Sequence, residues 1–328
     1  MHRPSLAIVT PALADANNGN WQTARRWSRM LGAAYRVELA AGWAGGDEAL
    51  MIALHARRSA VSILAWREAH PRRPLIVVLT GTDLYRDIDT AREARESLEA
   101  ADALIVLNER GTQRLPPALR GRCHVVLQSC AAQRPVPKSD RHLRVLMVGH
   151  LRDEKDPATY WRAAARLAAR VDVRFDHVGA ALDAELGAQA AAFAATHPHF
   201  RWLGAQTHGQ TRRRIRAAHV LVHPSRMEGG AHVVIEALRC GTPVIASRID
   251  GNLGLLGGDH PAAFAVGDDA ALACLIERAR DDPAMLPELR RHGDLRAPLF
   301  APQAEAAALH RLVAQLIHEA PETDDERT

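Results

Sequence analysis

Leu75-Ile-Val-Val-Leu79 is an uninterrupted apolar run that is followed directly by Thr80-Gly-Thr-Asp83. A short run without alternation is typical of a strand that is buried on both faces of a parallel sheet. Similar runs alternate with amphipathic stretches along most of the chain, and this alternation indicates βαβ units. The sequence therefore predicts an α/β fold built on parallel sheets.

The expected elements fall into two groups. The first has strands at 6–9, 36–39, 50–54, 75–79, 103–107 and 124–127, with helices at 21–31, 59–70 and 90–101. The second has strands at 143–148, 172–178, 200–203, 219–223 and 242–246, with helices at 157–170, 183–195, 208–217, 232–240 and 269–281. The stretch 133–140 between them contains two prolines and no apolar period, so it is predicted to be a linker.

Two doubly wound, Rossmann-like domains follow from this grouping, at 1–135 and 136–300. The segment 301–328 is expected to be a helix and a polar tail that packs back on the first domain. Ligands of open parallel sheets bind beyond the carboxyl ends of the strands. Two such domains facing each other would enclose a cleft between those ends.

The composition excludes several classes of protein. The chain has 328 residues, of which 47% are hydrophobic and 24% charged, as in ordinary globular proteins. No apolar run approaches the ~20 residues of a membrane span, and no signal peptide is recognised. The cysteines form no C-x-x-C pair, so neither a disulfide framework nor a Cys-rich zinc site is indicated. We expect a reduced, cytoplasmic protein.

The charge is only weakly basic, since 42 Lys and Arg residues face 38 Asp and Glu residues. The aromatic content is 4%, which is too low for a base-stacking surface. We therefore expect no nucleic-acid partner, and the arginines suit an anionic small molecule better. The chain has only two lysines, Lys138 and Lys155.

The segment Pro224-Ser-Arg-Met-Glu-Gly-Gly-Ala-His-Val-Val-Ile-Glu236 has the most specific pattern. It places Glu228 after a strand, then a glycine turn, and then a helix that carries Glu236. Glycines allow a close approach of the backbone to a ligand, and first-turn amides favour an anion. The other interpretation is that Glu236 caps a helix or pairs with a neighbouring arginine.

A second segment, Val148-Gly-His-Leu-Arg-Asp-Glu-Lys-Asp156, follows the first strand of the second group. A glycine turn with Arg152 and Lys155 at a helix start is an arrangement that can hold a phosphate. The other interpretation is a solvated surface turn.

Together with Cys240-Gly-Thr-Pro-Val-Ile-Ala246, these segments resemble the donor half of the GT-B retaining glycosyltransferases of the sucrose-synthase-like (GT4-like) family. The resemblance implies a nucleoside-diphosphate-sugar donor, and we expect Glu236 on the ribose and Glu228 on the sugar. The expected donor-binding residues are Gly19, Asn20, His150, Arg152, Lys155, Glu228, Gly229, Gly230, Ala231 and Glu236. His150 stands where the family usually has an arginine, so the diphosphate contact is expected to pass to Arg152.

The first half of the chain resembles the same family less closely. Asn17-Asn18-Gly19-Asn20 matches the family's loop at the donor phosphates, and Leu79-Thr-Gly-Thr-Asp-Leu84 matches a segment that usually contains a histidine in the place of Thr80. A neutral hydroxyl cannot act as a general base near neutral pH. Either another residue supplies the base, or the acceptor needs none.

Cationic side chains near the expected strand ends favour the second option, an anionic acceptor that is already ionised. The expected acceptor-binding residues are Arg57, Arg58, Arg86 and Arg226. Each of these could instead be a solvated surface arginine. Together with Glu228, the side chains of His55, Thr80 and Asp83 are the expected catalytic residues.

The motifs as a whole resemble a narrower group, the selenosugar synthases of selenoneine biosynthesis. They include Leu54-His-Ala-Arg-Arg-Ser-Ala60, Ser225-Arg-Met-Glu-Gly-Gly-Ala231 and Gly251-Asn-Leu-Gly-Leu-Leu-Gly257. This resemblance implies transfer from UDP-N-acetylglucosamine or UDP-glucose to selenophosphate, and a functional link to selenophosphate synthase. Selenium in selenophosphate is a soft, activated nucleophile that requires no base.

Two alternatives remain open: a conventional glycosyltransferase with a hydroxyl acceptor, and a non-catalytic nucleotide-sugar-binding protein. No cofactor and no metal are expected. His219 and His223 lie in one expected strand, where they share a face without forming a zinc site. Dinucleotide and P-loop signatures are absent from the sequence.

Overall fold

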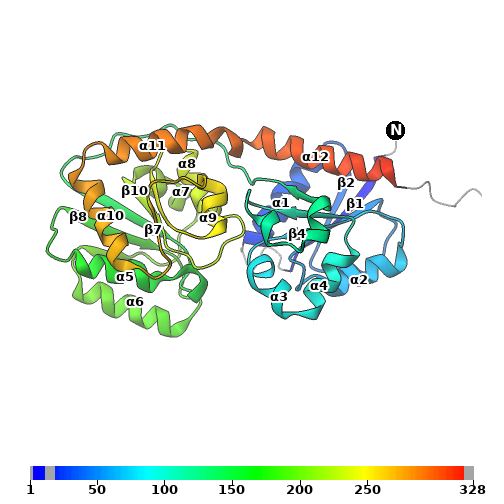
Figure 1. Ribbon diagram of the computed structural model, residues 1–328, viewed down its shortest axis with the longest axis horizontal. Coiled ribbons are helices and arrows are strands. Elements are labelled where there is room, and N and C mark those ends of the chain that lie inside the picture. Colours follow the sequence, from blue (N-terminus) through cyan, green and yellow to red (C-terminus); the bar gives the residue numbers. More distant parts are fainter. Residues whose placement is uncertain (1–2, 12–18, 321–328) are drawn as a thin grey trace, which may run out of the picture. The chain divides into compact units, whose positions relative to one another are not determined.

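The computed structural model describes residues 3–11 and 19–320. They form two compact units (Figure 1). Unit 1 contains the described residues up to Gln128 and those from Pro302 onward, and unit 2 runs from Ser129 to Ala301. Asn17 and Asn18 of the expected phosphate loop, and the polar tail, lie outside the described residues.

The described part of unit 1 contains a six-stranded parallel sheet in the order β2-β1-β3-β4-β5-β6. Its strands are β1 (Ser5–Val9), β2 (Arg36–Ala40), β3 (Leu50–Leu54), β4 (Leu75–Leu79), β5 (Ala103–Val106) and β6 (Cys123–Val125). Its helices are α1 (Gly19–Leu31), α2 (Ala60–Ala69), α3 (Ile88–Thr90), α4 (Arg92–Ala100) and α12 (Pro302–Glu319), with a π-helix at Asp83–Asp87.

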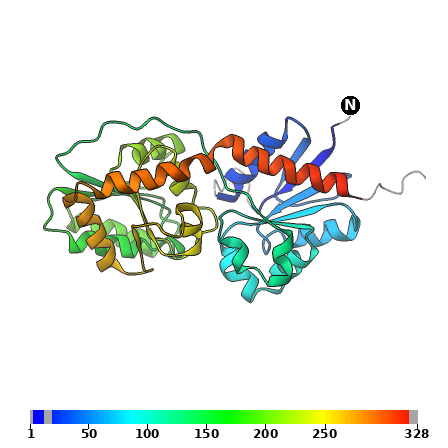
Figure 2. The same ribbon diagram turned by 45° about the horizontal axis from the view of Figure 1, so that its top comes forward.

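Strand β4 is buried along its whole length, because both faces of the sheet are covered. Ile76 and Val78 belong to a core cluster with residues of α1 and α12, whereas Leu75, Val77 and Leu79 belong to a cluster with residues of α2 and α4. In Figure 2, α12 runs alongside the elements at the N-terminal end of the chain. The buried carboxylate of Glu305 on α12 accepts hydrogen bonds from Arg26 and from Trp27 Nε1, the latter at 2.7 Å.

Unit 2 contains a second parallel sheet, whose six described strands follow the order β12-β11-β10-β7-β8-β9. The strands are β7 (Leu143–Val148), β8 (Val173–Val178), β9 (Phe200–Trp202), β10 (Val220–His223), β11 (Val244–Ser247) and β12 (Ala263–Phe264). The helices are α5 (Pro157–Arg166), α6 (Ala184–Thr196), α7 (His208–Ala217), α8 (His232–Leu238), α9 (Asp250–Leu256), α10 (Asp269–Asp281) and α11 (Met285–Arg296).

In each sheet the order in which the strands are added reverses at one point, and the two strands that are neighbours there are not consecutive in the sequence. In unit 1 the reversal lies between β1 and β3, and in unit 2 it lies between β7 and β10. Ligands of open α/β sheets bind at the carboxyl side of such a switch point. The predicted α/β class with two doubly wound parallel sheets is confirmed.

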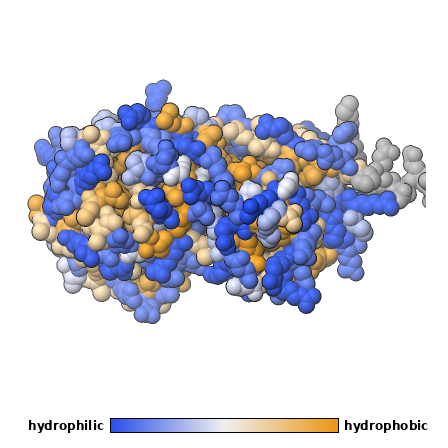
Figure 3. Space-filling model, viewed as in Figure 1, coloured by the Kyte–Doolittle hydropathy of each residue, from blue (hydrophilic) through white to orange (hydrophobic). Residues whose placement is uncertain are grey.

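No helix within 3–11 and 19–320 combines the length and apolar character that a bilayer crossing requires. Figure 3 shows hydrophilic residues over much of one face, with hydrophobic residues in smaller areas between them.

Candidate functional site

The loops after β7 and β10 bring the two predicted donor segments together at the switch point of unit 2. Lys155 lies in a 3₁₀ turn (Asp153–Lys155) after β7, and Glu228 lies in the loop after β10. The Lys155 ammonium donates a hydrogen bond to Glu228 Oε1. Two motifs that are 73 positions apart in sequence thus meet in one ion pair.

Glu228 is largely buried, with 10% of its side chain exposed. Burial alone would raise the pKa of this carboxyl group. The positive charge of Lys155 and the contact with His223 outweigh burial and hold the pKa well below its ordinary value. Glu228 is therefore a buried carboxylate that stays ionised.

His223, the last residue of β10, is fixed by a buried polar network. Its Nδ1 lies 2.9 Å from Asn252 Oδ1 and its Nε2 lies 3.4 Å from Glu228 Oε1. Asn252 Nδ2 donates to the carbonyl oxygen of Ser247 at 3.0 Å and to Ser247 Oγ at 3.0 Å. These two acceptors set the orientation of the Asn252 amide and so direct Oδ1 at the histidine.

The Gly149–His150 turn after β7 is held from beneath by buried side chains. Trp161 Nε1 donates to His177 Nδ1 at 3.3 Å, and His177 Nε2 donates to the Gly149 carbonyl oxygen at 3.0 Å. Burial lowers the pKa of His177 to about 4, so this histidine stays neutral and keeps that tautomer. A Cβ atom on Gly179 would lie 1.9 Å from the same carbonyl oxygen, which explains the glycine there.

His150 is exposed, and its Nδ1 accepts the backbone N–H of Ala180 at 3.0 Å. In the neutral ring the proton is therefore on Nε2, which remains a hydrogen-bond donor. Partial desolvation of the ring, together with the charges of Arg152 and Lys155, lowers the pKa of His150. A neutral donor thus occupies the position where the sequence resemblance places an arginine.

Arg152 is exposed, and its carbonyl oxygen accepts the Lys155 backbone N–H at 3.0 Å. Arg226 lies in unit 2 and binds Asp156 Oδ1 at 3.3 Å. Asp156 also caps α5 through Thr159. The predicted acceptor residue Arg226 is thus engaged with the carboxylate that begins α5.

Glu236 on α8 is buried and faces three basic side chains. Its Oε1 lies 2.6 Å from His208 Nε2, 3.6 Å from His232 Nδ1 and 3.8 Å from Arg212 Nε. Although burial alone would raise the pKa of Glu236, the hydrogen bonds with His208 and His232 lower it to about 2. The structure thus contains the arginine pairing that the second interpretation of this glutamate expected.

Gly229, Gly230 and Ala231 connect Glu228 to α8, and Ala231 is its N-terminal flanking residue. The backbone N–H of Val234 donates to the Ala231 carbonyl oxygen at 2.9 Å. Gly229 and Ala231 are buried, and Gly230 is half-buried. This short glycine turn carries the backbone from Glu228 into α8.

In unit 1, His55 directly follows β3 with a left-handed backbone (φ 72°), which is unusual for a residue with a side chain. Its Nδ1 accepts the backbone N–H of Arg58 at 3.3 Å, so the neutral ring carries its proton on Nε2. Nε2 then donates to Thr82 Oγ1 at 3.1 Å. Burial lowers the pKa of His55 more than the nearby carboxylates raise it. This histidine is a buried, neutral donor to Thr82.

Asp83 is fully buried at the start of the π-helix. One carboxylate oxygen accepts the backbone N–H groups of Thr80 and Gly81, both at 2.9 Å, and the other accepts that of Ala56 at 3.0 Å. The Asp83 side chain therefore joins the loops that follow β3 and β4. Thr80 is half-buried beside it.

The predicted acceptor arginines of unit 1 lie around these loops. Arg57 and Arg86 are about half-exposed, with 54% and 47% of their side chains accessible. Both approach Asp87 Oδ1, at 3.7 Å and 3.0 Å respectively. Arg58 is exposed as well. Gly19 and Asn20 begin α1, where the Gly19 carbonyl oxygen accepts the Thr23 hydroxyl at 2.9 Å.

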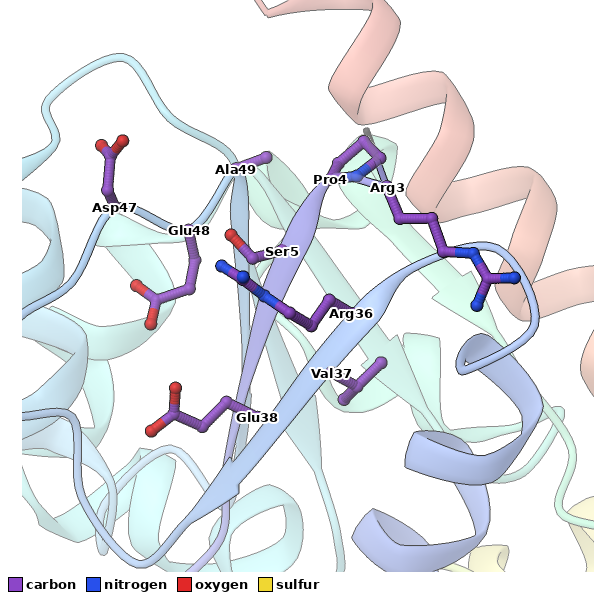
Figure 4. Close-up of a pocket in the computed structure, with 9 residues that line it drawn as sticks. All are labelled: Arg3, Pro4, Ser5, Arg36, Val37, Glu38, Asp47, Glu48 and Ala49. Atoms are coloured by element: carbon purple, nitrogen blue, oxygen red, sulfur yellow. The ribbon is translucent and has the colours of Figure 1, made fainter. Parts of the chain in front are cut away.

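A pocket of about 690 Å³ lies at the amino ends of β1, β2 and β3, at the end of the unit 1 sheet that is opposite to the loops after β3 and β4 (Figure 4). Arg36 extends between Glu38 and Glu48 in it. Its lining carries charges of both signs and contains none of the predicted site residues.

Sequence reasoning missed the partners of the predicted residues. Thr82 lies inside the motif Leu79-Thr-Gly-Thr-Asp-Leu84, but the sequence gives no sign of its contact with His55. His223 enters the sequence patterns with His219, as a pair that forms no zinc site. The position of His223 at the carboxyl end of a strand was the available signal. The other missed residues are Asp87, Ser247, Asn252, His208, Arg212 and His232. No cluster of described His, Cys, Asp and Glu side chains has the arrangement of a metal site.

Comparison with known proteins places this geometry in a family. The family described as glycosyl transferases group 1 matches residues 131–297, just over half of the chain. The chain belongs to this family. One curated relative is a D-inositol 3-phosphate glycosyltransferase of Arthrobacter sp. (strain FB24), to which this chain is 32% identical over 206 residues. The match covers 57% of the chain and 46% of that relative, so the chain spans under half of the relative's length.

Solved structures agree with this family fold over almost the whole chain. The sucrose-phosphate synthase of Thermosynechococcus elongatus has a TM-score of 0.78 at 18% identity, with 96% of this chain and 100% of that chain covered. Anabaena HepE, solved in complex with UDP-glucose, has a TM-score of 0.75 at 15% identity, with 95% and 100% covered. At these identities the likeness establishes the fold, and the expected GT-B class is confirmed.

Proposed function

We propose that this chain is a glycosyltransferase that binds a UDP-sugar on unit 2 and transfers the sugar to the selenium of selenophosphate. In this proposal Lys155, Arg152 and His150 contact the diphosphate, Glu228 binds the sugar and Glu236 binds the ribose. Family membership and the pairing of Lys155 with Glu228 at a switch point support the donor assignment.

The acceptor assignment rests on the hydrogen-bond donors and positive charges that lie in and around the loops after β3 and β4. His55 is buried and its Nε2 proton is directed at Thr82, while Arg57, Arg58 and Arg86 are exposed around it. Since the neutral His55 donates to Thr82 Oγ1, the hydroxyl proton of Thr82 can be donated elsewhere. Donors and cations suit an ionised acceptor, which needs to be held and not deprotonated.

The reaction balances without a base. The selenium lone pair forms a bond to the anomeric carbon, and the bond from that carbon to the UDP oxygen breaks with its electron pair. UDP leaves with its diphosphate next to Lys155 and Arg152, which stabilise the developing charge. Water then cleaves the selenium–phosphorus bond and releases phosphate and the selenosugar. Asp83 and His55 enter this proposal as residues that hold the acceptor loops in place.

A conventional glycosyltransferase is the second candidate, because the Arthrobacter relative is named for an acceptor that carries both a phosphate and hydroxyl groups. The exposed arginines would suit the phosphate of such an acceptor equally well.

One assay separates the candidates. UDP release from UDP-N-acetylglucosamine and UDP-glucose is measured with selenophosphate, with inositol phosphate and with no acceptor, and the products are identified by mass. A carbon–selenium product that depends on selenophosphate supports the proposal. Turnover with inositol phosphate alone supports the second candidate, and UDP-sugar binding without any turnover indicates a binding protein.

A further inference from the structure

Lys155 carries one positive charge, and the proposed function requires it in two places. It already pairs with Glu228, whose side chain is 10% exposed. A donor diphosphate beside Lys155 would share that charge. A buried carboxylate that loses its cationic partner is strongly destabilised. The site therefore needs a second group that can balance Glu228.

His223 is placed to do this. Its side chain is 1% exposed, and its Nε2 lies 3.4 Å from the same Oε1 atom that Lys155 contacts. This separation exceeds that of a strong hydrogen bond. Ser225 Oγ is a further neighbour of Nε2, at 3.4 Å.

The network behind His223 leaves one protonation site open. Asn252 Oδ1 accepts from Nδ1 at 2.9 Å, and the Asn252 amide is itself oriented by Ser247. The Nδ1 proton is thereby fixed, and a ring flip would break its hydrogen bond. A second proton, taken from solvent, can only be placed on Nε2, which faces Glu228.

We propose that His223, held by Asn252, is a positioning residue that becomes the cationic partner of Glu228 when a donor phosphate engages Lys155. This inference rests on the proposed function for the nature of the ligand. It assigns His223 the task of keeping Glu228 ionised and aimed at the donor sugar while Lys155 binds the diphosphate.

The first test follows the ring itself, using UDP as the probe and the full chain labelled with ¹⁵N-histidine. The His223 resonances are assigned from their loss in His223→Gln. We expect UDP to move the Nε2 resonance of His223 to the position of an imidazolium, whereas His219 should not change. An Nε2 resonance that stays unprotonated in a UDP-saturated sample overturns the inference.

The second test compares two substitutions of His223 that both introduce an amide group but differ in side-chain length. In His223→Gln the side-chain amide can still donate to Glu228, whereas in His223→Asn it can reach only toward Asn252. We expect kcat of His223→Asn to fall about tenfold or more below that of His223→Gln, the effect of losing one hydrogen bond to a buried charge. UDP affinity and the unfolding temperature should be similar in the two variants, and His219→Gln serves as the matched control. Equal kcat in both His223 variants contradicts the inference.

These outcomes are distinct from failure of the proposed function. If the wild-type chain binds no UDP, or binds it equally well after Lys155→Ala, the donor site itself is wrong and the inference falls with it. If UDP binds through Lys155 but no acceptor is turned over, the resonance of His223 still decides the inference.

Discussion

A Cβ atom on Gly251 would lie 1.9 Å from the carbonyl oxygen of Glu228 and 2.9 Å from the Glu228 Cβ. The first turn of α9 therefore packs directly on the loop that carries the proposed sugar-binding carboxylate. Asn252, the next residue, holds His223 from the same turn. Gly251 thus leaves room for the Glu228 backbone. Asn252 holds His223, whose Nε2 in turn approaches the Glu228 carboxylate.

We expect Gly251→Ala to displace Glu228, because the new methyl group meets backbone atoms that cannot move independently. Binding of UDP-sugar should weaken by about tenfold or more, a loss of roughly 1.4 kcal/mol, as measured by titration calorimetry. Gly121→Ala is the matched control, since a Cβ atom there meets nothing within 4 Å. Unchanged affinity in Gly251→Ala would show that this contact is dispensable.

The two lysines offer a paired experiment. Lys155→Ala should lower UDP affinity by at least tenfold, about 1.4 kcal/mol, because it removes a charged contact to phosphate. Lys138→Ala removes the other lysine, which lies outside the proposed site, and should leave UDP affinity unchanged. Equal affinities in the two variants would contradict the assignment of Lys155.

Glu236 should make folding stability depend on acid pH. Its pKa falls from the ordinary 4.5 to about 2 in the folded chain. Its ionised form therefore stabilises the fold above pH 4.5, and that contribution disappears as the pH falls toward 2. Glu236→Gln should be less stable than the wild type by about 1–3 kcal/mol near pH 6, since a neutral amide replaces the buried charged acceptor of His208 and His232.

The measurement is the urea midpoint of both proteins from pH 7 to pH 2. The difference between the urea midpoints of the wild type and Glu236→Gln, called the gap below, should narrow below pH 4.5. Because the hydrogen bond with Glu236 raises the pKa of His208, the gap should also shrink as the pH rises through that raised value. The exposed Glu185→Gln serves as control, and a gap that does not vary with pH would refute the linkage.

Thr82 and Thr80 can be compared in the same way. Thr82→Val removes the hydroxyl that accepts from His55 and should raise the KM for the acceptor several-fold while leaving UDP affinity unchanged. Thr80→Val should have a smaller effect, because the long contact of the Thr80 hydroxyl with Asp83 (3.4 Å) duplicates a 2.9 Å backbone contact. A larger effect at Thr80 would reverse this assignment.

Most of the fold could be predicted because its signals are local. Apolar runs such as 50–54 and 75–79 coincide with β3 and β4, and 208–217 coincides with α7. The helix predicted at 157–170 ends at Arg166 instead. The prediction ran too far because the residues of the following turn have the same apolar pattern as the helix.

Helix α9 could not be predicted. Gly251 and Gly254 lie inside its seven residues, and glycine is unfavourable in a helix. The position of Gly251 follows from a clash with Glu228, which is distant in sequence. The partners of Glu236 and His55 were missed for the same reason. Motifs identify the residue types of a site, whereas its hydrogen-bond partners come from loops that only the fold brings together.

The position of α12 has a consequence for how the protein is made. Leu309, Leu312 and Val313 complete the apolar face that Trp27 and Leu31 begin, and Glu305 is the acceptor for Trp27. On a translating ribosome, Ser129–Ala301 emerges before that helix does. The portion synthesised first is therefore the last to become complete, and a chain that stops short of Pro302 exposes a bare hydrophobic surface to the chaperones that survey nascent polypeptides.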